Sequence, residues 1–134
     1  MKKRGFGAGK WNGFGGKINS NETTEEAAIR ELYEEAKIYA NKLEKVGKLE
    51  FVFPFKEEWN QIVHLFIVKE WKGTPKESEE MLPKWFKINE IPFEKMWQDD
   101  KHWLPKILNG RKINAKFVFD KDNESIMEMR INED

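Results

Sequence analysis

Three glutamates in the first third of the chain are spaced so that their carboxylates could act together. Glu31, Glu34 and Glu35 stand at positions i, i+3 and i+4, which share one face of an α-helix. Like charges at this spacing destabilise an isolated helix by about 0.2–0.5 kcal/mol per pair. A cluster of oxygen ligands suits a hard divalent cation such as Mg²⁺, which shares its remaining positions with water and substrate phosphates. A solvated acidic face is the alternative interpretation.

Two adjacent aspartates, Asp99 and Asp100, form a second candidate group. If both face one partly buried pocket, they should not both be ionised, and the pKa of one should rise. A protonated and an ionised carboxyl would then present a donor and an acceptor together. The alternative for Asp99 is a capping role at the start of a helix.

The hydrophobic pattern predicts the elements that position these groups. Residues 24–36 read as a helix, with Thr23 and Glu26 at the spacing of a capping box. Its buried stripe is expected to contain Ile29, Leu32 and Ala36. A second helix is predicted over residues 93–108, with the aspartates in or near its first turn.

Strands are predicted over residues 48–55, 61–71 and 84–91, the second of them buried. Residues 115–119 and 125–131 are expected to form a closing hairpin. The glycine-rich residues 5–16 read as a loop entering a strand. Strands and two helices together predict a mixed α/β domain.

The composition sets the remaining bounds. The 134 residues suit a single domain over 1–134, and 24 basic residues balance 24 acidic ones, so the charge gives no argument for binding a nucleic acid polymer. No cysteine is present, which excludes disulfides, thiolate zinc sites and a cysteine nucleophile. No apolar run approaches the ~18 residues of a membrane span. We expect a cytoplasmic protein with no membrane association.

The spacing around the glutamates matches a longer pattern. Gly16 is followed by five residues and Glu22, then by seven residues and Arg30-Glu31-Leu32, one residue, Glu34-Glu35, two residues and Ile38. This resembles the Nudix box of hydrolases that act on nucleoside diphosphates linked to another group. The one departure is Lys37, where the family has a glycine that ends the helix in a left-handed conformation. A lysine there either costs about 1 kcal/mol or lets the helix run on.

The resemblance implies the Nudix fold, with a mixed β-sheet sandwiched between helices. It implies that Glu34 and Glu35 bind Mg²⁺, or Mn²⁺ as an alternative, and that Glu31 is a ligand or base. Gly16 and Glu80 are implied as further metal-site residues, and Glu35 is expected to face solvent and metal. A charge-assisted contact between Glu22 and Arg30 is implied to hold the loop and helix in register.

Outside the box, four stretches resemble the oxidised purine nucleoside triphosphate diphosphatase branch of the family: MKKRGFGAGKWNGFGGK, KVGKLEFVF, GTPKESEEM and IPFEKMWQDD. These enzymes remove 8-oxo-dGTP and 2-hydroxy-dATP from the nucleotide pool and release the monophosphate and pyrophosphate. The resemblance assigns base recognition to Asn12, Asp99 and Asp100 and stacking to Trp97. It assigns the pocket mouth to Lys2 and the pocket walls to Phe6, Phe51, Phe53, Trp103 and Phe119. Phe51, Phe53 and Phe119 could instead be core residues.

The family has a first strand ahead of the position of Met1. Without it, we expect an open sheet edge and an incomplete pocket, and self-association through that edge in place of the family's monomer. Two other functions stay open. One is a Nudix-fold protein of weak or no activity that binds nucleotide or a partner, and the other is a Nudix hydrolase for another nucleoside diphosphate derivative.

Overall fold

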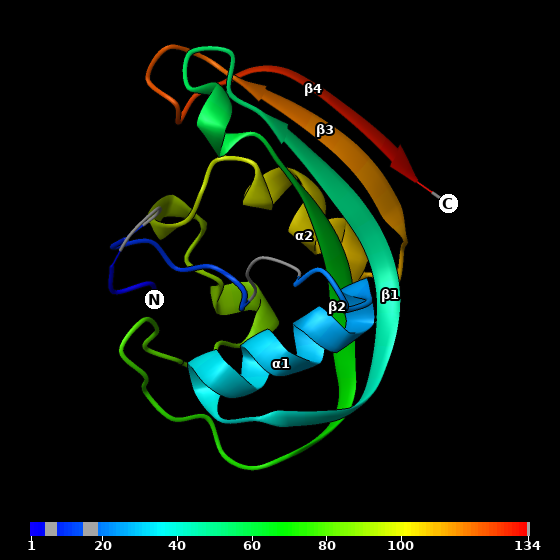
Figure 1. Ribbon diagram of the computed structural model, residues 1–134. Helices are drawn as coiled ribbons and strands as arrows, with labels where there is room; N and C mark the ends of the chain where they lie inside the picture. Colours follow the sequence, from blue (N-terminus) through cyan, green and yellow to red (C-terminus); the bar gives the residue numbers. More distant parts are fainter. Residues whose placement is uncertain (5–7, 15–18, 134) are drawn as a thin grey trace. The chain divides into compact units, whose positions relative to one another are not determined.

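The computed structural model describes residues 1–4, 8–14 and 19–133 (Figure 1). Among these residues are two α-helices, α1 (Thr24–Ala36) and α2 (Asp100–Leu108), and a four-stranded sheet. Its strands, in the order β2-β1-β3-β4, are β1 (Tyr39–Val52), β2 (Gln61–Lys72), β3 (Ile113–Phe119) and β4 (Ile126–Glu133). The pair β1–β3 is parallel and β3–β4 is antiparallel, so the predicted mixed α/β class is confirmed.

The chain divides into two compact units. Unit 1 comprises Met1–Glu44 and Phe66–Met96, and unit 2 comprises Lys45–Leu65 and Trp97–Asp134. Strands β1 and β2 each contribute residues to both units. The glutamate cluster belongs to unit 1 and the aspartate pair to unit 2. A single domain over 1–134 stays a prediction.

In unit 1, the predicted capping box begins α1. The Glu26 N–H donates to Thr23 Oγ1 at 3.1 Å, and the Thr23 N–H donates to Glu26 Oε1 at 3.0 Å. The helix ends at Lys37, which adopts the left-handed conformation at φ 61° and ψ 29°, and its N–H donates to the Tyr33 carbonyl. Of the two outcomes expected for a lysine here, the strained cap is the one present.

The buried face of α1 differs from the expected stripe. Ala36 is fully buried, whereas Ile29 and Leu32 are only half-buried. Glu35 is buried with 6% of its surface exposed, so the expectation that it faces solvent is wrong. A carboxylate placed there needs compensating polar or charged groups.

The loop after β2 is fastened to the end of α1. The Lys76 N–H donates to the Ala36 carbonyl at 2.9 Å. Gly73 has φ 100°, and a Cβ at this position would lie 2.9 Å from the Lys37 carbonyl oxygen, so only glycine fits without movement. This contact brings the loop that carries Glu80 to the C-terminal end of the glutamate helix.

In unit 2, residues Gly47–Val52 of β1 pair with Ile113–Val118 of β3. A Cβ on Gly47 would lie 2.2 Å from the Ile113 carbonyl oxygen, so this close approach of two strands requires glycine. The unit buries one apolar set, which consists of Val46, Leu49, Phe53, Ile107, Ile113, Ala115, Phe117 and Phe119.

Several predicted boundaries are wrong. The strand predicted over 48–55 begins at Tyr39 and ends at Val52, before Pro54. Residues 84–91 contain a 3₁₀ turn at Ile88–Glu90 in place of a strand. The second helix starts only at Asp100, because Phe93–Lys95 forms a separate 3₁₀ turn and Met96 is extended.

Strand β2 lies where it was predicted but is half-buried to exposed, because it stands at one end of the described sheet. The closing hairpin is confirmed. In the predicted entry strand, Lys2 forms an isolated antiparallel bridge with Met81, and residues 5–7 and 15–18 lie outside the described part. None of the described helices is long and apolar enough to cross a membrane.

Candidate functional site

Arg30 gathers three carboxylates in unit 1. Its Nε and Nη2 atoms donate to the two oxygens of Glu22 at 2.7 and 3.0 Å. Its Nη1 atom donates to Glu31 Oε1 at 2.9 Å and to Glu34 Oε2 at 3.2 Å. The implied contact between Glu22 and Arg30 is therefore present, in the bidentate geometry that guanidinium and carboxylate favour.

These bonds determine the charge states around the helix. The hydrogen bond from Arg30, helped by one from the Asn19 N–H, lowers the pKa of Glu22. The same bond raises the pKa of Arg30. The repulsion between carboxylates on one helix face is thus relieved by an arginine on that helix, and Glu22 stays ionised in even mildly acidic solution.

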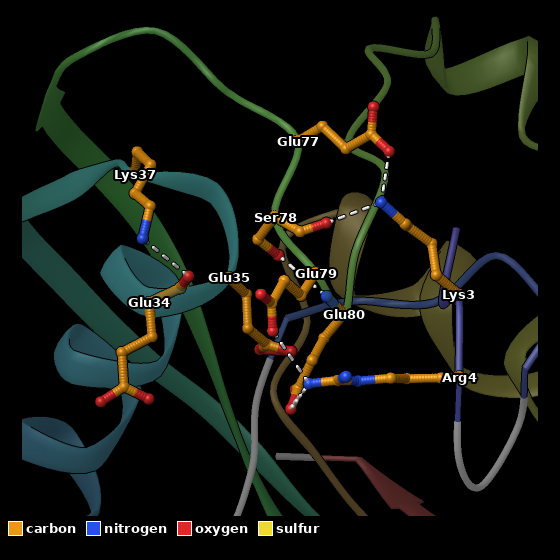
Figure 2. Close-up of a pocket in the computed structure, with 9 residues that line it drawn as sticks. All are labelled: Lys3, Arg4, Glu34, Glu35, Lys37, Glu77, Ser78, Glu79 and Glu80. Atoms are coloured by element: carbon orange, nitrogen blue, oxygen red, sulfur yellow. Dashed lines mark hydrogen bonds and ion pairs between the residues drawn. The ribbon is translucent and has the colours of Figure 1, made fainter.

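A pocket of about 750 Å³ lies beside this cluster (Figure 2). Five glutamates line it, together with three basic side chains and one serine: Glu34, Glu35, Glu77, Glu79, Glu80, Lys3, Arg4, Lys37 and Ser78. Arg4 Nη2 lies 3.5 Å from Glu79 Oε2 and 3.6 Å from Glu80 Oε1. Lys3 Nζ donates to the Ser78 carbonyl at 2.8 Å and to the Glu77 carboxylate.

Sequence reasoning missed the cations of this pocket. Lys3 and Arg4 belong to the basic start of the chain, and the loop pairs them with Glu77, Glu79 and Glu80. The available signal was the run of two lysines and an arginine ahead of the glycine-rich loop, matched by three acidic residues within 77–80. This signal could not be interpreted from the sequence alone, because the two segments lie far apart in the chain. Lys3 and Glu77 are separated by 74 positions, and Arg4 and Glu79 by 75.

The donor set of this pocket fits a hard divalent cation, because Glu34, Glu35 and Glu80 all offer carboxylate oxygens. Among the described residues, however, no three such side chains already stand at cation-binding distance. Arg30 engages Glu31 and Glu34, and Figure 2 shows the Glu34 carboxylate pointing away from that of Glu35. Gly16, another implied metal-site residue, lies outside the described residues.

In unit 2, the two aspartates are buried, with 3% of Asp99 and 7% of Asp100 exposed. The Trp103 Nε1–H donates to Asp99 Oδ2 at 2.8 Å. Asp99 stands at the N-cap of α2 but its side chain makes no capping hydrogen bond, so the capping alternative is wrong. Asp100 Oδ2 is buried and has no hydrogen-bond partner among the described residues.

Burial raises the pKa of both aspartates. For Asp100 the desolvation and the neighbouring charge of Asp99 raise the pKa to about 8. For Asp99 desolvation also raises the pKa, while the Trp103 hydrogen bond opposes the rise. The predicted upward shift is confirmed, and at neutral pH the pair contains a protonated carboxyl.

The aromatic residues predicted for this site divide into two groups. Phe53 and Phe119 are 2% and 1% exposed and stack at 4.6 Å between ring centroids, so they are core residues. Trp97 is half-buried and meets Phe119 edge-on at 6.3 Å. Phe51 is also half-buried, 5.9 Å from Phe117. Stacking by Trp97 and walls formed by Phe51 and Trp103 stay predictions.

The remaining implied residues belong to unit 1. Asn12 is half-buried beside Trp11, whose N–H donates to the Lys95 carbonyl at 2.9 Å and whose ring packs edge-on against Phe86 at 5.0 Å. Lys2 is half-buried, and its backbone N–H donates to the Lys10 carbonyl. Phe6 lies outside the described residues. The roles of Asn12, Lys2 and Phe6 stay predictions.

Comparison with known proteins supplies independent findings. The NUDIX domain profile matches residues 1–107. Proteins named oxidized purine nucleoside triphosphate hydrolase, from Mus musculus and from Danio rerio, are each 46% identical over 133 residues, which is 99% of this chain and 84% of the relative. The 8-oxo-dGTP diphosphatase of Escherichia coli is 34% identical over 74 residues, 55% of each chain.

A solved structure, described as a MutT protein from Bacillus halodurans, superposes with a TM-score of 0.82 and 26% identity. The match covers 92% of this chain and 83% of that one. The fold similarity thus extends well beyond the glutamate helix.

Proposed function

The chain belongs to the Nudix family, and from this premise we propose that it hydrolyses oxidised purine nucleoside triphosphates to the monophosphate and pyrophosphate. The names of the mouse and zebrafish relatives support this substrate class. Such an enzyme acts on free nucleotides, so we expect it to work in the cytoplasm and to need neither a membrane nor a nucleic acid polymer.

The observation that carries the substrate class is the buried aspartate pair. A buried oxygen without a partner among the described residues, such as Asp100 Oδ2, is rare in folded proteins, and we propose that a purine edge is its partner. A purine edge offers N–H donors and carbonyl acceptors in the same plane. Asp100, protonated at neutral pH, can donate to an acceptor on that edge, while an ionised oxygen of the pair accepts from a donor.

The pair also explains how several oxidised purines could bind. Because the two carboxyls are adjacent and buried together, their titrations are linked, and we propose that the bound base decides which of them holds the proton. Exchanging the protonated partner reverses donor and acceptor positions without moving the backbone. Trp103 limits this freedom, since its indole N–H requires Asp99 Oδ2 to remain an acceptor.

In unit 1, we assign Mg²⁺ to Glu34, Glu35 and Glu80, with Glu31 as a further ligand or as the base that takes a proton from the attacking water. Bound Mg²⁺ would supply charge neutralisation on the phosphates and a water of lowered pKa. Mn²⁺ has the same ligand preference. To serve as ligands, Glu31 and Glu34 must exchange part of their contact with Arg30 for the ion.

The other charged side chains position these groups. Arg30, fixed by two bonds to Glu22, holds the starting end of the helix and its approach loop together. Lys3 and Arg4 add positive charge to a pocket lined by five glutamates, and we propose that they favour binding of phosphate oxygens. Burial of Glu35 restricts its carboxylate to a narrow range of orientations.

Steady-state hydrolysis of 8-oxo-dGTP, 2-hydroxy-dATP and dGTP, with Mg²⁺ and with excess chelator, tests the proposal. We expect pyrophosphate release, a higher kcat/KM for the oxidised nucleotides and loss of turnover in chelator. Equal kcat/KM for 8-oxo-dGTP and dGTP would contradict the substrate class. Release of orthophosphate would contradict the reaction, and turnover of only dinucleotides or ADP-ribose would indicate a different Nudix activity.

A further inference from the structure

Strand β4 leaves one side of its backbone without a partner in the described sheet. All of its pairing is with β3, in a register that runs from Ile113 opposite Glu133 to Phe119 opposite Ile126. The strand is last in the sheet order and lies at the outer side of β3 in Figure 1. Its eight residues contain no proline or glycine, so its outer N–H and C=O groups can accept another strand.

The side chains of β4 carry apolar surface along this edge. Met127 and Met129 are 49% and 50% exposed, and Ile131 is half-buried. Met129 and Ile131 stand opposite Phe117 and Ala115 of β3 and share one face of the sheet, whereas Met127 stands at a register irregularity opposite Val118 and Phe119. Edges in monomeric proteins are usually blunted by short length, proline or charges that point inward. From Met129 to Ile131 this face of β4 carries no proline and no charge; the register irregularity and Glu133 lie at the two ends of the strand.

The opposite face of β4 carries two charges that lack ion-pair partners. Arg130 stands opposite Lys116 of β3, a like charge, and Glu128 stands opposite Val118. Within the described part of the chain, no salt bridge involves Arg130 or Glu128, whereas nearby Glu133 pairs with Lys106 and Arg111. Like charges directly opposite each other destabilise a strand pair.

The charges of β4 are complementary to those of a second β4 strand that runs antiparallel to it. In an antiparallel pair of two β4 strands centred on Met129, Glu128 lies opposite Arg130 of the second copy, and Arg130 opposite Glu128. Met129 lies opposite Met129 of the second copy on the other face. A centre at Arg130 or at Glu128 would instead place that charge opposite itself, so charge selects the Met129 register.

We propose that β4 is a self-association edge, at which two copies of the chain join their sheets through antiparallel β4 strands in the Met129-centred register. The contact is isologous, so it closes as a two-fold dimer and leaves no further edge of the same kind. It uses only residues of unit 2 and is independent of the hydrolytic function. In the dimer, Glu128 of the second copy provides the carboxylate partner that Arg130 lacks within its own described sheet.

The test uses charge reversal and sedimentation velocity over a series of protein concentrations. The parent chain is expected to self-associate, more weakly at high salt because the pairs are solvent-exposed. E128R makes both positions basic and R130E makes both acidic, so each variant alone should associate at least about tenfold more weakly. An equimolar mixture of the two should associate again, because every basic residue then meets an acidic one.

Two control variants show whether any loss of association is specific to the charge pairing in β4. The double variant E128R/R130E exchanges the charges within one strand and should dimerise like the parent. E58R, a reversal at an exposed glutamate of the 3₁₀ turn Glu57–Trp59, should also leave association unchanged. Circular dichroism verifies that each variant is folded. A parent that stays monomeric throughout, or single variants that associate like the parent, would overturn the proposal, as would a mixture that fails to recover.

Discussion

Both candidate groups bring carboxyls that would repel one another close together, but the two groups reduce this repulsion in opposite ways. In unit 1, three glutamates share one guanidinium, and the hydrogen bond from Arg30 lowers the pKa of Glu22. In unit 2, Asp99 and Asp100 are buried, no salt bridge to either of them is present among the described residues, and desolvation raises the pKa of both. Glu22 is kept ionised by its arginine partner, and the aspartate pair is kept partly protonated by its surroundings.

The difference fits the two tasks of the proposed reaction. Ionised carboxylates bind a divalent cation and accept protons, which is what phosphate hydrolysis needs. A protonated carboxyl beside an ionised one can donate and accept, which is what reading a purine edge needs. The two groups should therefore respond differently to substitution and to pH.

The largest effect is expected from Glu35→Gln. The amide keeps the shape of the buried side chain but removes the charge that would hold the metal, so kcat should fall by roughly two to four orders of magnitude. Glu25→Gln, which neutralises an exposed glutamate in the first turn of the same helix, is the matched control and should retain turnover. Parent-like kcat in folded Glu35→Gln would mean that the cluster is not the catalytic group.

Arg30→Lys is expected to have the next largest effect. Lysine keeps the positive charge but cannot form the two parallel bonds to Glu22 or reach Glu31 and Glu34 at once. Outer residues that orient metal ligands typically contribute about 10–100-fold to activity, and we expect a loss of kcat in that range. The KM for the nucleotide should change little, because the substitution leaves the aspartate pair unchanged. If Glu22→Gln adds its full loss to that of Arg30→Lys, the two residues do not act as a unit.

Asp100→Asn tests the other group through stability. A carboxyl whose pKa rises from 3.8 to about 8 on folding binds its proton more tightly in the folded chain. Stability therefore decreases as the pH rises from about 4 to about 8, and the neutral amide removes this loss. The Tm of the variant relative to the parent should increase by about 4 °C or more between pH 5 and pH 8, the shift that about 1 kcal/mol produces in a domain of this size.

Asp122→Asn is the control for this experiment. Hydrogen bonds from Ser125 and Glu124 lower the pKa of the exposed Asp122 carboxyl, so its contribution to stability is lost as the pH falls. Because that loss occurs only below the ordinary aspartate pKa of 3.8, the Tm of this variant relative to the parent should stay constant between pH 5 and pH 8. The same trend in both variants would show that the pH effect is not specific to the buried pair.

The smallest effect is expected at the end of the glutamate helix. Lys37 has φ 61°, a left-handed conformation that glycine adopts without strain. Lys37→Gly should therefore raise the free energy of unfolding, measured by chemical denaturation, by about 1 kcal/mol. Lys37→Ala keeps a Cβ and should give no gain. A Lys37→Gly variant less stable than the parent would show that the lysine contact to the Glu34 carbonyl outweighs the strain.

The sequence predicted what local chemistry determines. The capping box at Thr23 and Glu26 needs only residues three positions apart, and both of its bonds are present. The closing hairpin was found because alternation and a turn define it locally. The upward pKa shift of the aspartate pair followed from adjacency together with the assumption of burial.

The sequence failed where long-range contacts decide. Periodicity placed Glu35 among exposed carboxylates, but residues from the start of the chain and from 77–80 line the pocket beside it. Phe53 and Phe119 stack on each other, and no pattern in either strand distinguishes a pocket wall from a core residue. The helix predicted over 93–108 is interrupted before Asp100, which local propensity did not show.

Titration of the carboxyl carbons by ¹³C NMR tests the contrast between the two groups most directly. With selectively labelled aspartate, the Asp100 resonance should titrate near pH 8, while Asp122 should titrate below the ordinary range of an aspartate. Assignment comes from the resonance missing in Asp100→Asn. An Asp100 midpoint below about pH 5, the ordinary behaviour of an exposed aspartate, would contradict a protonated carboxyl at neutral pH and the base recognition built on it.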